Sequence, residues 1–233
     1  MPQNGSLPLY QQISELLIRD LAAGRLIDGT RLAPEREMAA EMGIAVGTLR
    51  KALADLTTKG LLERVQGSGN YIRAKPEVDS VYALFRLELL AGGGLPTAEV
   101  LSVERLPKPP DLPPFGHSVE AHRIRRLRRV SGRAAAVEEI WLDADYTDRI
   151  TAEDLSESLY LFYRQRLGLW IQRAEDRVGL DGVPGWAPPA FAPRPGTPAP
   201  LIERRSWAQD GTIAEFSRTW FDKDIVRYVA RLR

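Results

Sequence analysis

The chain has 233 residues, of which 44% are hydrophobic and 27% are charged, and its formal net charge is +1. This composition supports one large or two small globular domains and excludes a disordered chain. The sequence contains no cysteine, which excludes disulfides, thiolate catalysis and zinc sites built on cysteine. It shows no signal peptide and no apolar run that approaches a membrane span. We therefore expect a cytoplasmic protein with no membrane partner.

Positive charge is concentrated in one stretch of the first third of the chain. Residues 1–44 carry four Lys and Arg against six Asp and Glu, whereas residues 45–75 carry six against two. A local cationic excess, in a chain that is nearly neutral as a whole, indicates a polyanionic partner for that stretch.

Residues 1–74 predict three short helices and a hairpin. Apolar residues recur at helical spacing over 9–23, 34–43 and 46–59, and a glycine ends each of the three helices. Pro34 suits the first position of the second helix, because a residue there has no N–H bond to lose. The runs "LLERV" and "NYIRA" flank "QGSG", which is the composition of a tight β-hairpin.

This order of elements is that of a winged helix-turn-helix. The third helix is narrow enough to enter the major groove of DNA, and the hairpin, or wing, can lie along the backbone or in the minor groove. Basic residues of helix and hairpin, among them Lys51 and Arg64, would then converge on phosphates from two sides. Gly67 and Gly69 would let the wing turn approach the sugar-phosphate chain closely. A basic three-helix module that binds another protein is the alternative.

Beyond a polar linker at 75–80, residues 81–233 change to a strand-rich pattern. Strands are predicted over 98–106, 118–130, 134–142, 200–208 and 214–221, and one helix is predicted over 158–168. Two proline-rich stretches, 107–116 and 183–200, predict surface loops. The fold class is therefore α+β, with an N-terminal winged helix-turn-helix domain joined to a C-terminal, mostly antiparallel α+β domain.

The first domain resembles the N-terminal domain of GntR-family bacterial transcription regulators. The shared features are "LYQQI", a "G-x-L-x-x-G-x-x-L" turn, "PERE", "TLRKAL" and "L-x-x-x-G-L-L-x-R-x-x-G-x-G". The resemblance implies that Arg36, Thr48 and Arg50 contact DNA, and that the wing glycine Gly67 contacts or approaches the minor groove. For each residue the alternative is a surface position at the end of an element.

The sequence departs from the family at the start of the third helix. Many members carry Ser-Arg at the positions of Ala45 and Val46, and that Arg reads guanine. Val46 cannot donate a bidentate hydrogen bond to guanine, and Gly47 offers no side chain. We expect Arg36, Arg50 and the wing to supply most of the affinity. The operator should then differ from the usual family operator at the base that faces Val46.

The second domain resembles the UTRA effector-binding domain of the HutC-type subfamily, which is related in fold to chorismate lyase. The matching pieces are "RIRRLR", "AAAVEEIWL", "SESLYLFY" and "LIERRSWAQDGTIAEFSRTWF". The chain has two histidines, too few for the metal-binding helical effector domains of another GntR subfamily. We expect neither a metal nor a cofactor.

Strand alternation places Arg126 and Arg128 on one face of the sheet. Two guanidinium groups that point inward need an anion, and phosphate or carboxylate fits their planar donor geometry. Glu138, in an apolar strand context, can accept hydrogen bonds from sugar hydroxyls. The alternative is structural, with the arginines paired to the acids of "VEE".

Three further residues complete the predicted effector pocket. Ser158 and Tyr160 stand at the start of the predicted helix, where hydroxyls and backbone N–H groups favour an anion. Glu215 lies in an apolar strand and, like Glu138, can accept hydrogen bonds from a ligand. The resemblance implies that these positions line the pocket, although Ser158 is equally suited to be only a helix N-cap.

Together these features predict a homodimeric repressor that binds a near-palindromic operator in double-stranded DNA. A small anionic effector, such as a phosphorylated sugar or a small carboxylic acid, would control that binding. Two alternatives belong to other classes: a lyase-like enzyme acting on a small aromatic acid, and a DNA-binding protein without a ligand. No metal cluster and no Ser-His-Asp arrangement support the enzyme, so we expect a protein that is not an enzyme.

Overall fold

The computed structural model describes residues 7–22, 24–73, 82, 84–155 and 158–231. The linker expected at 75–80 lies outside the described residues. The described chain divides into two compact units, which we call the head unit (7–95 with 228–231) and the sheet unit (96–227). Each is considered separately below.

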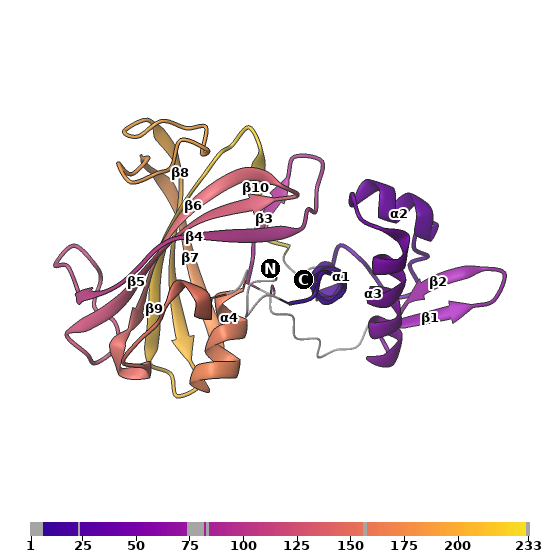
Figure 1. Cartoon of the computed structure of the whole chain (residues 1–233), viewed down its shortest axis with the longest axis horizontal. Helices are drawn as coiled ribbons and strands as arrows, with labels where there is room; N and C mark the ends of the chain where they lie inside the picture. The colour runs from indigo at the N-terminus through magenta and orange to yellow at the C-terminus, as the bar shows by residue number, and fades with distance from the viewer. Residues whose placement is uncertain (1–6, 23, 74–81, 83, 156–157, 232–233) are drawn as a thin grey trace. The chain divides into compact units, whose positions relative to one another are not determined.

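The head unit contains the three predicted helices and the predicted hairpin. Their bounds are α1 (Leu9–Ala22), α2 (Glu35–Glu41), α3 (Val46–Thr58), β1 (Leu62–Val65) and β2 (Gly69–Ile72), and they are labelled in Figure 1. The predicted apolar spacing is confirmed, because Ile13 of α1 and Leu49 and Leu53 of α3 are completely buried in one core. Each such side chain contributes about 1.5–3 kcal/mol to folding. Pro34 lies one residue before α2 rather than at its first position.

Gly60 ends α3 and Gly69 shapes the wing, as the sequence predicted. Gly60 follows α3 with φ +69°, and two backbone hydrogen bonds of 2.9 Å close the helix end, from Gly60 N to Thr57 O and from Leu61 N to Leu56 O. This is the Schellman arrangement, in which only glycine accepts the left-handed conformation without strain. In the wing, β1 and β2 pair antiparallel, and the turn between them ends at Gly69 with φ +134°.

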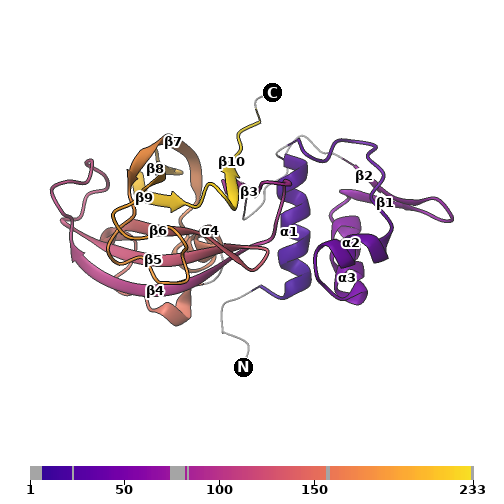
Figure 2. The same cartoon turned by 90° about the horizontal axis from the view of Figure 1, so that it is seen from above.

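The sheet unit is built on one six-stranded antiparallel sheet with the order β4-β5-β6-β9-β8-β7. Figures 1 and 2 show its curvature from two directions. The strands are β4 (Pro96–Pro107), β5 (Glu120–Val130), β6 (Arg133–Asp143), β7 (Ile171–Gly182), β8 (Pro198–Ala208) and β9 (Ile213–Phe221). Two strands of three residues were not predicted: β3 (Leu87–Leu89), which belongs to the head unit, and β10 (Val226–Tyr228), whose last residue does. The helical segments are η1 (Ala144–Tyr146), η2 (Ala152–Asp154), α4 (Leu159–Phe162) and η3 (Tyr163–Leu167).

Each face of the sheet has its own core. On one face, Leu142 of β6 packs with Phe162 and Tyr163 of the helical segment, and we call this the helix face. On the other, which we call the loop face, Leu127 and Trp220 pack with the loop that follows β7. The two faces can therefore carry two independent sites.

Two predictions for this unit needed correction. The stretch 171–182 was not predicted as a strand, yet it forms the edge strand β7. The loop predicted at 183–200 ends earlier, because Pro198 and Pro200 already belong to β8. They pair only with β7, since the pairing of β8 with β9 begins at Leu201. Proline is tolerated there because its missing N–H faces a side with no partner strand.

The predicted helix over 158–168 is confirmed in extent but not in winding. After one α-helical turn, Tyr163–Leu167 form a π-helical turn that ends at Gly168, with φ +62°. Isolated π turns are frequent at functional sites, because the extra residue redirects the side chains of that turn.

Candidate DNA-binding surface and effector site

The exposed side of α3 is cationic, as the sequence predicted. Arg50 and Lys51 are both exposed, and 61% of the Arg50 side chain is accessible to solvent. Arg36 is exposed on α2, and Thr48 is half-buried in the first turn of α3. Neither Arg36 nor Lys51 has an ion-pair partner among the residues that the structure describes. The apolar residues of α3 point the other way into the core, so the cationic side is free to meet a partner.

Glu35 holds two of the predicted DNA-binding arginines together. Its carboxylate accepts a hydrogen bond of 2.6 Å from Arg50 Nε and lies 3.8 Å from Arg64 Nη2. The hydrogen bond and charge of Arg50, with the charge of Arg64, lower the pKa of Glu35, so it stays ionised at neutral pH. Sequence reasoning did not single out Glu35. It orients Arg50 in the free protein, and a phosphate is the natural competitor for the same guanidinium.

A groove runs between the wing and the start of α2. Its volume is about 510 Å³, and Arg31, Arg64, Gly67 and Gly69 are among the residues that line it. A Cβ atom on Gly69 would lie 3.1 Å from Arg31 Nε, so glycine allows this arginine to cross the wing. Gly67, by contrast, has open space around it. Arg31 was missed because a single arginine in a turn gives no periodic signal.

The departure at the start of α3 has a structural counterpart. Val46 is half-buried and packs against the core of the head unit. Gly47 is exposed, and a Cβ atom placed there would meet nothing within 4 Å. The first turn of α3 therefore presents little side-chain chemistry to a partner.

The structure brings Arg126, Arg128 and Glu138 together on the helix face. Arg126 Nη2 lies 2.7 Å and Arg128 Nη2 lies 3.1 Å from the same carboxylate oxygen of Glu138, and all three side chains are buried. The structural alternative is thus partly realised, because Glu138 supplies an anion to both arginines. The neighbouring Arg125 pairs with Glu139 in the same way.

Arg126 nevertheless keeps unused donors. The residue is 3% exposed, and its Nε and Nη1 atoms have no hydrogen-bond partner in the described structure. Burial lowers the pKa of Arg126, while the charge of Glu138 opposes that change. For Glu138, burial alone would raise the pKa, but the charges of Arg126 and Arg128 lower it to about 2. An unpaired buried donor costs roughly 1–3 kcal/mol, so these two atoms mark a place where an acceptor is missing.

Glu215 is the centre of a second polar cluster on the helix face. Its carboxylate accepts hydrogen bonds from Tyr163 Oη (2.6 Å), Ser206 Oγ (3.0 Å) and Tyr160 Oη (3.3 Å). Burial raises the pKa of Glu215. Burial and the charge of Glu215 also raise the pKa of Tyr160 to about 12, so the phenol remains a donor at neutral pH.

Arg204 extends this cluster, and sequence reasoning missed it. It forms two hydrogen bonds to Asp176 of β7, of 2.5 and 2.7 Å, and interacts with Tyr160. Ser158 caps α4, because its Oγ accepts a hydrogen bond of 3.3 Å from Leu161 N. The N-cap alternative is therefore present in the structure, and the hydroxyl hydrogen of Ser158 can still donate elsewhere.

No three His, Cys, Asp or Glu side chains of the described residues come close enough to hold a metal ion. None of the helices in the described ranges is long and apolar enough to cross a bilayer.

Comparison with known proteins assigns both parts of the chain. Residues 9–72 match the family described as bacterial regulatory proteins, gntR family, and residues 91–227 match the UTRA domain. The chain belongs to the GntR family and carries a UTRA domain. The HTH-type transcriptional regulator SmoD of Agrobacterium fabrum (strain C58 / ATCC 33970) is 66% identical over 229 residues, 98% of each chain. The resemblance inferred from the sequence motifs is thereby confirmed.

Two more distant comparisons agree with the assignment to the GntR family. The repressor MngR of the mannosyl-D-glycerate transport/metabolism system of Escherichia coli (strain K12) is 28% identical over 234 residues. These residues are 96% of this chain and 95% of MngR. The crystal structure of YydK from Bacillus subtilis, a possible transcriptional regulator, has a TM-score of 0.53 at 19% identity and covers 97% of this chain and all of its own. At that identity the likeness shows the fold alone.

The GntR protein is thus a DNA-binding transcriptional regulator with an effector domain, and not an enzyme. The α+β fold class is confirmed as well. The comparisons do not test the individual residues, so the contacts of each with DNA or effector remain predictions.

Proposed function

We propose that this regulator is a homodimeric repressor that binds a near-palindromic operator and is released from it by a small anionic effector. Twofold symmetry in the protein is matched by twofold symmetry in the DNA, so two heads would bind two half-sites. The repressor role is supported by the relative MngR, which is named as a repressor.

The DNA-contacting surface in this proposal is the cationic side of the head unit. The predicted contacts are Arg36, Thr48, Arg50, Lys51, Arg64, Gly67 and Gly69. Arg31 joins them because it lines the wing groove together with Arg64 and is exposed. Val46, packed against the core, leaves one base unread, so the operator should lack the guanine preference at that position. Selection of bound sequences from a random pool tests this, and a dominant guanine there would contradict it.

The effector site in this proposal is the polar centre of the helix face. Its residues are Arg126, Arg128, Glu138, Ser158, Tyr160 and Glu215. The observation that carries it is the buried guanidinium of Arg126 with two unused donors, since an incoming phosphate or carboxylate oxygen would satisfy them. Hydroxyl groups of a sugar suit the adjacent acceptor and donor atoms of Glu215 and Tyr160. The relative MngR is named as the repressor of a mannosyl-D-glycerate transport/metabolism system.

Control of DNA binding requires the effector to prefer one state of the protein. An effector with equal affinity for the DNA-competent and incompetent states would shift nothing, however tightly it bound. Couplings of about 1–3 kcal/mol are typical and would change operator affinity by about 5- to 150-fold.

A thermal-shift screen against phosphorylated sugars and small carboxylates tests the proposal directly. A hit should raise the unfolding temperature and release a labelled operator fragment from the protein. Arg126→Gln should abolish both responses, while Glu138 keeps Arg128 as its partner. Arg125→Gln is the matched control, because it removes an Arg–Glu pair from the same strand on the loop face. A hit that acts equally on both variants would exclude Arg126 from the site.

A further inference from the structure

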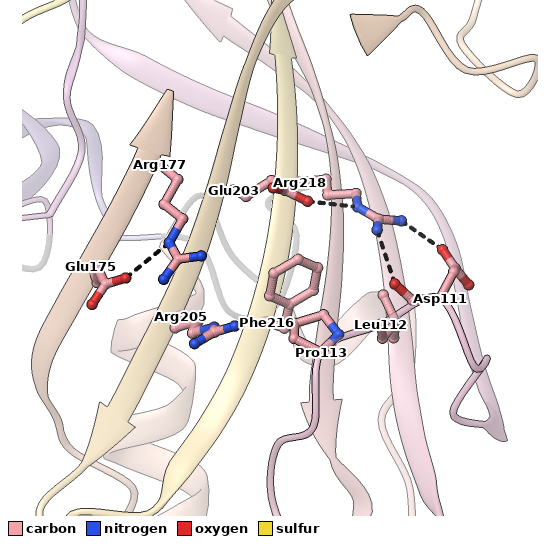
Figure 3. A pocket seen from close by; sticks show the side chains of 9 residues that line it. All are labelled: Asp111, Leu112, Pro113, Glu175, Arg177, Glu203, Arg205, Phe216 and Arg218. Carbon is pink, nitrogen blue, oxygen red and sulfur yellow. Dashed lines mark hydrogen bonds and ion pairs between the residues drawn. The ribbon is translucent and has the colours of Figure 1, made fainter. Parts of the chain in front are cut away.

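A separate cavity lies on the loop face of the sheet. Its volume is about 280 Å³, and strands β7, β8 and β9 form its floor (Figure 3). Arg205 of β8 lies between Arg204 and Ser206, whose side chains point to the helix face, so its own side chain points the opposite way. The cavity is therefore distinct from the effector site proposed above.

The charges in this cavity are unevenly paired. Arg218 binds two acids, Glu203 at 3.3 Å and Asp111 at 3.0 Å. Arg177 binds Glu175 at 3.1 Å. Arg205 lies directly opposite Glu175 in the strand register, yet that carboxylate is turned to its neighbours along β7.

The guanidinium N–H donors of Arg205 are consequently left unpaired. The residue is half-buried, and its guanidinium has no hydrogen-bond or ion-pair partner anywhere in the described ranges; no dashed line reaches it in Figure 3. A guanidinium offers two parallel N–H donors that match a carboxylate. The lining contains three acids and three arginines, so it has no net positive charge to balance a dianion such as phosphate, and this favours a group with a single negative charge.

The three remaining residues that line the cavity are apolar. Phe216, only 3% exposed, is the direct strand partner of Arg205, and Leu112 and Pro113 form the wall on the far side. Figure 3 shows the Phe216 ring between the Arg205 guanidinium and this wall. The volume lies just below the range of about 300–1,000 Å³ usual for ligand pockets, so the occupant should be small.

We propose that this cavity binds a small monocarboxylate with a single apolar ring. The carboxylate would accept hydrogen bonds from Arg205, and the ring would lie against Phe216, Leu112 and Pro113. Such a site would give the regulator a second ligand-binding site, separate from the effector site proposed on the helix face.

Benzoate is the probe for this site, and benzamide, which has the same shape without the charge, is its neutral control. Binding to the full chain is measured by saturation-transfer difference NMR. We expect saturable, millimolar benzoate binding that weakens about tenfold or more for benzamide and for Arg205→Gln. Arg129→Gln, which removes another half-buried arginine outside the cavity, should bind benzoate like the wild type. Thermal unfolding checks that both variants are folded.

Three outcomes would overturn the proposal. The first is the absence of saturable benzoate binding to the wild-type chain. The second is equal binding of benzoate and benzamide, or equal binding by wild type and Arg205→Gln. The third is loss of benzoate binding in Arg126→Gln rather than in Arg205→Gln, which would place the ligand in the site on the helix face.

Discussion

Replacement of Arg50 by alanine tests the DNA-binding surface most directly. The Arg50 side chain is 61% exposed, and its hydrogen bond to Glu35 lies at the surface. A surface ion pair contributes about 0–1 kcal/mol, and Glu35 keeps Arg64 nearby, so the free energy of unfolding should fall by less than about 1 kcal/mol. Loss of one arginine contact to DNA costs about 1–3 kcal/mol, which is a 5- to 150-fold loss of operator affinity.

The assay is fluorescence anisotropy of a labelled operator over a range of salt concentrations. If Arg50 contacts a phosphate, the slope of log K against log salt should also fall by about one unit. Arg73→Ala is the control, because Arg73 likewise pairs with an acid, Glu63, and is 47% exposed, but lies outside the wing groove. Unchanged affinity of Arg50→Ala, or an equal loss in Arg73→Ala, would refute the assignment of α3 as the reading helix.

Three further predictions concern stability. Gly47→Ala should stabilise the head unit by about 0.5–1 kcal/mol, seen in urea unfolding, because the added methyl group meets nothing and the unfolded chain loses freedom; a destabilised variant would contradict the open site. Gly69→Ala should cost about 1–3 kcal/mol and speed hydrogen exchange in the wing, because φ is +134° and the new Cβ would crowd Arg31; unchanged exchange would contradict this. Glu138→Gln should cost about 3–5 kcal/mol, because two buried guanidinium groups lose their anion. In the wild type, the lowered pKa of Glu138 means that its ionised form increases the free energy of unfolding. This contribution is complete above about pH 4.5 and is lost as the pH falls toward 2. Urea unfolding at pH 7 and pH 3 should therefore show a smaller acid loss in Glu138→Gln, and an equal loss would show that Glu138 is not the group responsible.

The head unit could be predicted almost completely from its sequence, because local signals determine it. Helical spacing places Ile13 and Leu49 in the core, and glycine at position 60 fixes where α3 ends. Arg50 and Lys51 lie on the exposed side of the same periodic helix, so their surface position followed without knowledge of any other element. The roles of Glu35 and Arg31 could not be predicted from the sequence, because they depend on which residues of α3 and the wing come close to them.

The edge strand β7 was missed for a physical reason. Strand signals come from apolar residues buried on at least one face, and β7 is exposed along most of its length. Its charged residues, such as Arg173 and Arg177, are typical of strands that must not pair with a second chain. An exposed edge carries little apolar pattern, so β7 and everything that depends on it, including the Asp176–Arg204 pair and the loop-face cavity, could not be inferred from the sequence.

The contact between Arg126 and Glu138 shows how far a sequence argument about a site can reach. Strand alternation correctly placed Arg126 and Arg128 on one face of the sheet. Ser131 and Gly132, which both have positive φ angles, form the two-residue turn that joins β5 to β6. A regular hairpin with that turn would set Arg126 opposite residue 137 and leave Glu138 opposite residue 125. A bulge between Arg128 and Arg129 shifts the register by one residue, so Glu138 faces Arg126 instead. One extra residue in β6 thus decides which arginine lies opposite Glu138, and no periodicity in the sequence predicts this bulge.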